Sequence, residues 1–141
     1  MKNGLRVAID TNILYMFLYR AESKPGLIIK AATEEKIILV STDSVKEELR
    51  RLLKTDFNQT DVEAENIISS LPIEWYNREI YLSFMEEAKI MPHKPDRPLV
   101  ALALLLNFGI LSANHTHFKH VKKVVKVWEI DELLNKVKSP E

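Results

Sequence analysis

The 141-residue chain contains no cysteine and only 3 glycines. Without cysteine, disulfides, thiolate metal ligands and cysteine nucleophiles are excluded. The few glycines leave no glycine-rich phosphate-binding loop. The longest uninterrupted apolar run, residues 99–106, is far too short to span a membrane. Lys+Arg and Asp+Glu both number 20, so any nucleic-acid contact must come from local basic patches rather than from net charge.

The remaining composition is that of a globular protein, with 46% hydrophobic and 28% charged residues. The length suits one domain covering residues 1–141, with enough chain to bury a continuous core. Residues 1–4 run directly into the first strand-like segment, which gives no sign of a signal peptide. A cytoplasmic protein with no membrane association is therefore expected.

Strand-like and helix-like segments alternate along the chain. Strand-like runs lie at residues 5–9, 37–40, 72–76, 110–112 and 124–128, and helix-like runs at 12–20, 25–35, 45–53, 62–71, 78–89, 99–107 and 132–137. Thr60 and Glu63 have the spacing of a capping box, and three prolines predict a stiff loop over residues 91–98. The alternation predicts an α/β fold on a largely parallel sheet.

Acidic residues stand at three places that such a sheet can bring together. Asp10 follows the apolar run of residues 7–9, Glu48 lies in the helix after the second strand, and Asp96 begins the apolar helix. A carboxylate at the tip of a buried strand costs several kcal/mol unless a cation or hydrogen bonds compensate. Because ligands bind at the carboxyl ends of parallel strands, the three acids predict a divalent-cation site and phosphodiester chemistry.

At these residues the chain resembles the PIN-domain family of metal-dependent ribonucleases. The resemblance is carried, in order, by residues 7–12, 41–49, 96–104 and 113–118, and it spans nearly the whole chain. It implies a three-layer α/β/α sandwich whose acids, here Asp10, Glu48 and Asp96, bind Mg²⁺ or Mn²⁺ and activate water against RNA. Glu48 matches better than Glu47 because it directly precedes Leu49. Many small family members are toxins with a cognate antitoxin, and others process RNA.

The fourth string departs from the family pattern. After Asn114, His115 and His117 stand where the family usually carries acids. Imidazole can bind Mn²⁺ or Zn²⁺ but is a poor ligand for Mg²⁺. The departure leaves two readings open: an endoribonuclease with a three-acid site, or a catalytically weakened PIN-like module that binds RNA or protein without cleavage.

Each candidate also has a purely structural interpretation. Asp10 and Asp96 are both placed to cap the helices that follow them, and Glu48 is spaced to pair with Arg51. Asn12 and Asn114 fit either as groups that orient ligands or as turn formers, and His115 and His117 fit ordinary loop positions.

Partners are predicted from two basic clusters and one apolar face. Basic residues gather at positions 46, 50, 51 and 54 and again at 119, 120, 122, 123 and 126, which suits either an RNA backbone or plain solvation. Leu14, Phe17, Leu18 and Tyr19 suggest a homodimer face. The resemblance adds an antitoxin or another protein as a partner.

Overall fold

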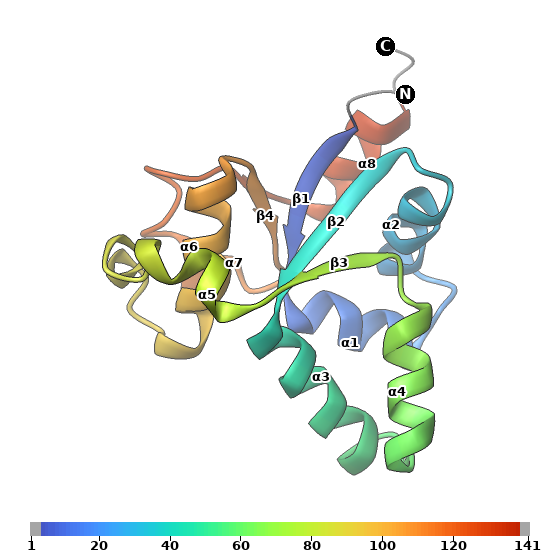
Figure 1. The fold of residues 1–141 in the computed structure, drawn as a ribbon. Helices are drawn as coiled ribbons and strands as arrows, with labels where there is room; N and C mark the ends of the chain where they lie inside the picture. The colour runs from blue at the N-terminus through green and yellow to red at the C-terminus, as the bar shows by residue number, and fades with distance from the viewer. Residues whose placement is uncertain (1–3, 139–141) are drawn as a thin grey trace.

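A computed structural model describes residues 4–138 and shows a five-stranded, wholly parallel sheet (Figure 1). The strands are β1 (Leu5–Ile9), β2 (Ile37–Thr42), β3 (Ile73–Tyr76), β4 (Gly109–Leu111) and β5 (Val127–Trp128), in the order β3-β2-β1-β4-β5. The prediction of an α/β fold on a parallel sheet is confirmed. The expectation drawn from the start of the chain falls on residues 1–3, which lie outside the described residues.

Helices cover both faces of the sheet, as the three-layer prediction requires. They are α1 (Thr11–Tyr19), α2 (Lys24–Thr33), α3 (Asp43–Thr55), α4 (Asp61–Ser70), α5 (Arg78–Tyr81), α6 (Arg97–Leu106), α7 (His115–Phe118) and α8 (Ile130–Lys138), with 3₁₀ turns η1 (Leu82–Phe84), η2 (Glu87–Ile90) and η3 (Lys94–Asp96). Helix α6 packs on β1, β2 and β4, whereas α2 packs on β2 and on α8 at the other side (Figure 1). Among residues 4–138, no helix combines the length and apolarity that a membrane crossing requires.

The helix starts follow from side-chain caps. Thr42 accepts a hydrogen bond from the backbone N–H of Val45 and so begins α3, and the predicted capping box of Thr60 and Glu63 begins α4. Helix α6 ends earlier than predicted, because Asn107 takes a left-handed conformation with φ 60°. The caps therefore fix where α3 and α6 present their side chains.

The core lies on both faces of the sheet and includes most of α6. Val7, Ala8 and Ile9 of β1 are fully buried, and α6 is buried from Pro98 to Ala103, which agrees with its nearly continuous apolar sequence. Leu14 is also fully buried, so it cannot contribute to the homodimer face that the sequence suggested.

The segment before α6 differs most from the prediction. Instead of one helix over residues 78–89, α5 stops at Tyr81, and η1 and η2 follow. A continuous helix would have buried one apolar face, but this segment buries Tyr81, Ala88 and Met91 instead. Tertiary packing therefore overrides local helix propensity here. The predicted loop contains η3, and α6 begins two residues early with Pro98 in its first turn.

The end of the chain was also predicted imperfectly. Helix α7 was not expected, and the predicted strand over residues 124–128 shrinks to two residues. The backbone N–H of Val125 donates to the carbonyl of Val121, so this part of the chain turns instead of extending. Helix α8 begins at Ile130, ahead of the predicted residue 132.

The strand order places a topological switch point between β1 and β4. From β1 the chain proceeds to β2 and β3 on one side, and β4 continues to β5 on the other, so the direction of winding reverses between β1 and β4. Ile9 pairs with Leu111, and the N–H of Asp10 donates to the carbonyl of Leu111. Such switch points, at the carboxyl ends of parallel strands, are where open α/β sheets bind ligands.

Candidate metal centre

Asp10 lies at the switch point, directly after β1. Its side chain is almost buried, with the residue 7% exposed. Oδ1 accepts from the backbone N–H of Thr11 at 2.8 Å, and Oδ2 accepts from the hydroxyl of Ser112 at 2.9 Å. Asp10 is therefore also the N-cap of α1. The same carboxylate can be a helix cap and a candidate metal ligand, because its two oxygens have different partners.

The surroundings of Asp10 disfavour its charge. Burial, followed by the nearby negative charges of Asp96 and Glu48, raises the pKa of Asp10 to about 6, against the partial opposition of its two hydrogen bonds. The charged side chains that act on Asp10 are thus both acids. A cation at this edge would relieve the burial and the repulsion together.

Glu48 reaches the same edge from α3. Its Oε1 accepts a hydrogen bond of 2.9 Å from the hydroxyl of Thr11, which lies beside Asp10. Among residues 4–138, no ion pair joins Glu48 to Arg51, so the structural interpretation of Glu48 as a partner of that arginine is wrong. Thr11 was not singled out from the sequence. A hydroxyl residue directly after an acid at a strand end is the signal that could have identified it.

Asp96 approaches the edge from the start of α6. Asp96 occupies the N-cap position of α6, as the sequence allowed, but its side chain makes no capping hydrogen bond to the helix. Its Oδ2 lies 2.9 Å from Nδ1 of His93 and 3.5 Å from Nδ1 of His117. The carboxylate is 16% exposed and faces Asp10 closely enough to raise the pKa of that residue.

The loop after β4 completes the edge. Ser112 is fully buried, donates to Asp10, and accepts from the amide of Asn12 at 3.3 Å and from the N–H of Asn114 at 3.0 Å. Asn12 Oδ1 accepts in turn from the N–H of Ala113. Asn12 and Asn114 therefore orient Ser112, which the sequence reasoning missed although it sits directly after a buried strand.

The two histidines of the fourth string have different positions. His117 lies beside Asp96, and its Nδ1 is also 2.9 Å from the amide nitrogen of Asn114. His115 does not join this group; its Nδ1 is buried and has no hydrogen-bond partner among the described residues. Of the two, only His117 faces the acidic edge.

The donor set of Asp10, Glu48 and Asp96 fits a hard divalent cation. All three offer carboxylate oxygens, which Mg²⁺ and Mn²⁺ prefer. Within residues 4–138, however, the one set of three or more acids and histidines whose ligand atoms all lie within 4.8 Å of one another is His93, Asp96 and His117. An ion shared by the three acids would therefore be held partly through water, as is usual for Mg²⁺.

Basic side chains line a hollow beside Glu48. The hollow measures about 520 Å³ and is bounded by Ser44, Glu47, Glu48, Arg50, Arg51, Lys54 and Thr55. Arg50 pairs with Glu47 and Glu65, and Lys54 pairs with Asp61. Arg51 makes no such pair among the described residues, and it is exposed. One cation beside the acids is thus available for a bound anion.

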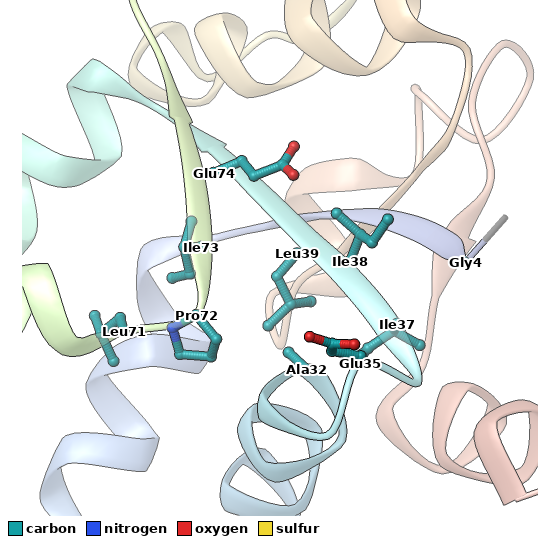
Figure 2. Close-up of a pocket in the computed structure, with 10 residues that line it drawn as sticks. All are labelled: Gly4, Ala32, Glu35, Ile37, Ile38, Leu39, Leu71, Pro72, Ile73 and Glu74. Atoms are coloured by element: carbon teal, nitrogen blue, oxygen red, sulfur yellow. The ribbon is translucent and has the colours of Figure 1, made fainter. Parts of the chain in front are cut away.

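A larger hollow lies away from the acids. It measures about 670 Å³ and is lined mainly by apolar side chains of β2 and β3, such as Leu39 and Ile73 (Figure 2). Leu39 and Ile73 are paired in the sheet three positions before Thr42 and Tyr76, which end the two strands. This hollow therefore faces the opening halves of β2 and β3, far from the carboxyl edge.

A sequence profile of the PIN domain matches residues 8–138. The chain belongs to the PIN-domain family. This match confirms the resemblance inferred from the sequence, and PIN domains generally depend on divalent metal ions. No curated protein sequence matches the chain.

Two solved structures have a similar fold. VapBC2 from Rickettsia felis, bound to a DNA fragment from its promoter, matches with a TM-score of 0.65 at 14% identity, over 89% of this chain and 98% of that one. VapBC-1 from nontypeable Haemophilus influenzae matches with a TM-score of 0.60 at 17% identity, over 90% of this chain and 99% of that one. At these identities the likeness establishes the fold of the PIN domain alone.

Proposed function

We propose that this PIN-domain protein is a metal-dependent endoribonuclease in which Asp10, Glu48 and Asp96 hold Mg²⁺ or Mn²⁺. One observation carries the proposal: a nearly buried carboxylate, Asp10, whose charged neighbours are both acids. Such an arrangement is unfavourable for folding alone and becomes favourable with a cation present. Membership of the PIN family supports nuclease chemistry in general terms.

The polar side chains around the acids hold them in position. Ser112 fixes one oxygen of Asp10, and Thr11 fixes Glu48, so both carboxylates are oriented before a ligand arrives. A bound divalent ion supplies an activated water and neutralises charge on the phosphate. The chain itself then has to position the phosphodiester.

RNA is the proposed substrate, and the hollow beside Glu48 supports this choice. Arg51 has no ion-pair partner among the described residues and lines that hollow. The guanidinium of Arg51 can therefore bind a backbone phosphate of the RNA beside Glu48. The basic residues at positions 119, 120, 122, 123 and 126 do not line this hollow, and Lys126 pairs with Glu132.

The proposed biological role is that of a toxin-type nuclease with an antitoxin protein as partner, acting in the cytoplasm. Both similar structures are VapBC assemblies, and one of them includes promoter DNA, which supports a protein partner for this chain. A homodimer stays a prediction. Of the residues expected to form its apolar face, Leu14 is buried, Phe17 and Leu18 are partly buried, and Tyr19 is 77% exposed.

The test is cleavage of labelled single-stranded RNA in the presence of Mn²⁺ by the wild-type protein and by the Asp10→Asn variant. We expect cutting by the wild type and none by the variant. Asp131→Asn is the matched control: Asp131 is exposed on α8, pairs with Lys24 at the surface, and its loss should leave cleavage unchanged. Equal cutting by wild type and Asp10→Asn overturns the proposal.

A second candidate function has one observation in its favour. His93 and His117 flank Asp96, which removes negative charge from the side of the site where the family usually carries more acid. A PIN-like module that binds RNA or protein without cleaving is the alternative. It predicts retained RNA binding together with no stoichiometric Mn²⁺ uptake at neutral pH.

A further inference from the structure

Three side chains with metal-binding atoms gather at Asp96, where α6 begins. The ligand atoms of His93, Asp96 and His117 all lie within 4.8 Å of one another. The imidazole rings of His93 and His117 are 4.4 Å apart between centroids and tilted by 34°. His93 was not singled out by the sequence, and this set contains neither Asp10 nor Glu48.

The chain builds this cluster from anchored backbone. The N–H of Asp96 donates to the carbonyl of His93, so the turn of η3 holds the two side chains on the same side. The guanidinium of Arg97 donates to the carbonyl of Met91 at 2.7 Å, which closes the loop across its base. His117 comes from α7, whose neighbouring Phe118 is fully buried. The three side chains are therefore brought together by the fold.

The interactions inside the cluster depend on which ring nitrogen of His117 carries the proton. When the amide of Asn114 donates to Nδ1 of His117, that nitrogen carries a lone pair and no proton. The lone pair then faces the carboxylate oxygen of Asp96 at 3.5 Å, and two electron-rich atoms repel each other. A metal ion between them turns this repulsion into two coordinate bonds.

We propose that His93, Asp96 and His117 form a binding site for a divalent transition-metal ion, with Zn²⁺ the best match. Two imidazole nitrogens and one carboxylate oxygen are a common zinc ligand set, with a fourth position left for water. Neighbouring ligands of a tetrahedral zinc site lie roughly 3.3 Å apart. The 3.5 Å separation of Asp96 and His117 already fits, and the 2.9 Å separation of His93 and Asp96 has to open slightly.

The site is open to an incoming ion. The side chains of His93 and His117 are 48% and 39% exposed, so small movements of these two rings can close the widest gap in the cluster. Mg²⁺ is a poor match, because it avoids nitrogen ligands. The zinc site is thus chemically separate from the proposed nuclease site and does not rest on it, although both use Asp96.

The test is a titration of the purified, metal-free protein with Zn²⁺ at neutral pH against a chromogenic zinc chelator. We expect one tightly bound ion per chain. His93→Gln and His117→Gln should each weaken the affinity by more than roughly 100-fold, since loss of a ligand exceeds the 10–100-fold cost of losing a group that only orients one.

His120→Gln is the matched control, because His120 is an exposed histidine near α7 that lies outside the cluster. It should leave zinc affinity unchanged. Zinc K-edge absorption of the 1:1 complex should show imidazole scattering, and this signal should weaken in His93→Gln, an exposed loop substitution that leaves the core untouched.

Two results would overturn the zinc site: no stoichiometric zinc uptake, or equal affinity in the wild type and both cluster variants. RNA is absent from the titration, so a failure of the zinc site is distinguishable from a failure of the nuclease proposal. Should His117→Gln fail to fold, His93→Gln decides the matter alone.

Discussion

The two sides of Asp96 differ in the atoms they offer. Asp10 and Glu48 present only oxygen and are held by hydrogen bonds from Ser112 and Thr11; Asp10 is nearly buried, whereas Glu48 is exposed. His93, next to η3, and His117, in α7, present nitrogen from partly exposed side chains. The same carboxylate therefore borders two environments of opposite metal preference.

This difference teaches that the acidic pattern of a PIN domain does not by itself fix which ion the site takes. Hard ions such as Mg²⁺ favour the oxygen side, and borderline ions such as Zn²⁺ favour the nitrogen side. An ion that engages Asp96 on the nitrogen side lowers the negative charge available to the oxygen side. Variants that remove the oxygen ligands and keep the histidines, or the reverse, test this difference.

The largest effect is expected from Glu48→Gln. The amide keeps an oxygen that can accept from Thr11, so the fold should survive while a metal-binding charge is lost. Mn²⁺-dependent RNA cleavage should fall by more than roughly 100-fold, measured as initial rates on labelled RNA. Glu47→Gln is the control, because Glu47 is exposed and pairs with Arg50. A larger loss of cleavage rate in Glu47→Gln than in Glu48→Gln would show that the wrong acid has been assigned to the site.

Next comes the stability of the metal-free protein after Asp10→Asn. The pKa of Asp10 rises from 3.8 to about 6 on folding, so its ionised form opposes folding. The protonated carboxyl instead favours folding. Its contribution to the free energy of unfolding is complete below pH 3.8 and is lost as the pH rises through about 6. In chelator at pH 7, the variant should therefore be more stable by about 3 kcal/mol in urea unfolding.

The gain in Asp10→Asn should shrink as the pH falls and nearly vanish at about pH 3, where the wild-type carboxyl is protonated in both states. Asp131→Asn again serves as the control, because Asp131 is exposed and should show no such pH dependence. A variant that is less stable than the wild type at pH 7 would contradict the account of Asp10 as a strained carboxylate.

A smaller loss is expected from Ser112→Ala. It removes the hydroxyl that orients Asp10 and leaves the N–H of Asn114 without its acceptor. Cleavage should fall by roughly 10–100-fold, and the free energy of unfolding by about 1–2 kcal/mol. Ser70→Ala, at the exposed end of α4, tests whether any serine loss has this effect. Zinc affinity should not change, which separates the two sides of Asp96.

The smallest effect is expected from Arg51→Ala. RNA affinity should weaken modestly, and the slope of log affinity against log salt concentration should drop by about 0.7, the value for one phosphate contact on a single strand. Arg20→Ala provides the comparison, since Arg20 is exposed at the far end of α1. An unchanged slope in Arg51→Ala would remove the hollow beside Glu48 from the proposed RNA path.

Local patterns in the sequence were sufficient for the sheet, for α6 and for the family. Alternating segments and a helix that is apolar on nearly every side are read within short windows, and both features reappear in the fold. The strand-end position of Asp10 was equally visible. The roles of Asp10, Glu48 and Asp96 as metal ligands remain predictions.

The contacts that organise the site were beyond such reasoning. Asp10 meets Ser112 across 102 positions, and Thr11 meets Glu48 across 37, so only the pairing of β1 with β4 and the packing of α1 on α3 reveal these contacts. His93 lay unnoticed in a proline-rich loop, because its partner His117 belongs to a short helix that no periodic pattern announces. Breaks such as the one after Tyr81 arise in the same way, from packing between distant segments.

The most direct test of the central claim is a crystal soaked in Mn²⁺, with the ion located by its anomalous scattering. The account predicts a peak at the carboxyl ends of β1 and β4 that touches at least one of Asp10, Glu48 and Asp96 and reaches the others directly or through one water. A peak confined to His93 and His117 would contradict the account, and so would the absence of any peak at a saturating concentration of Mn²⁺.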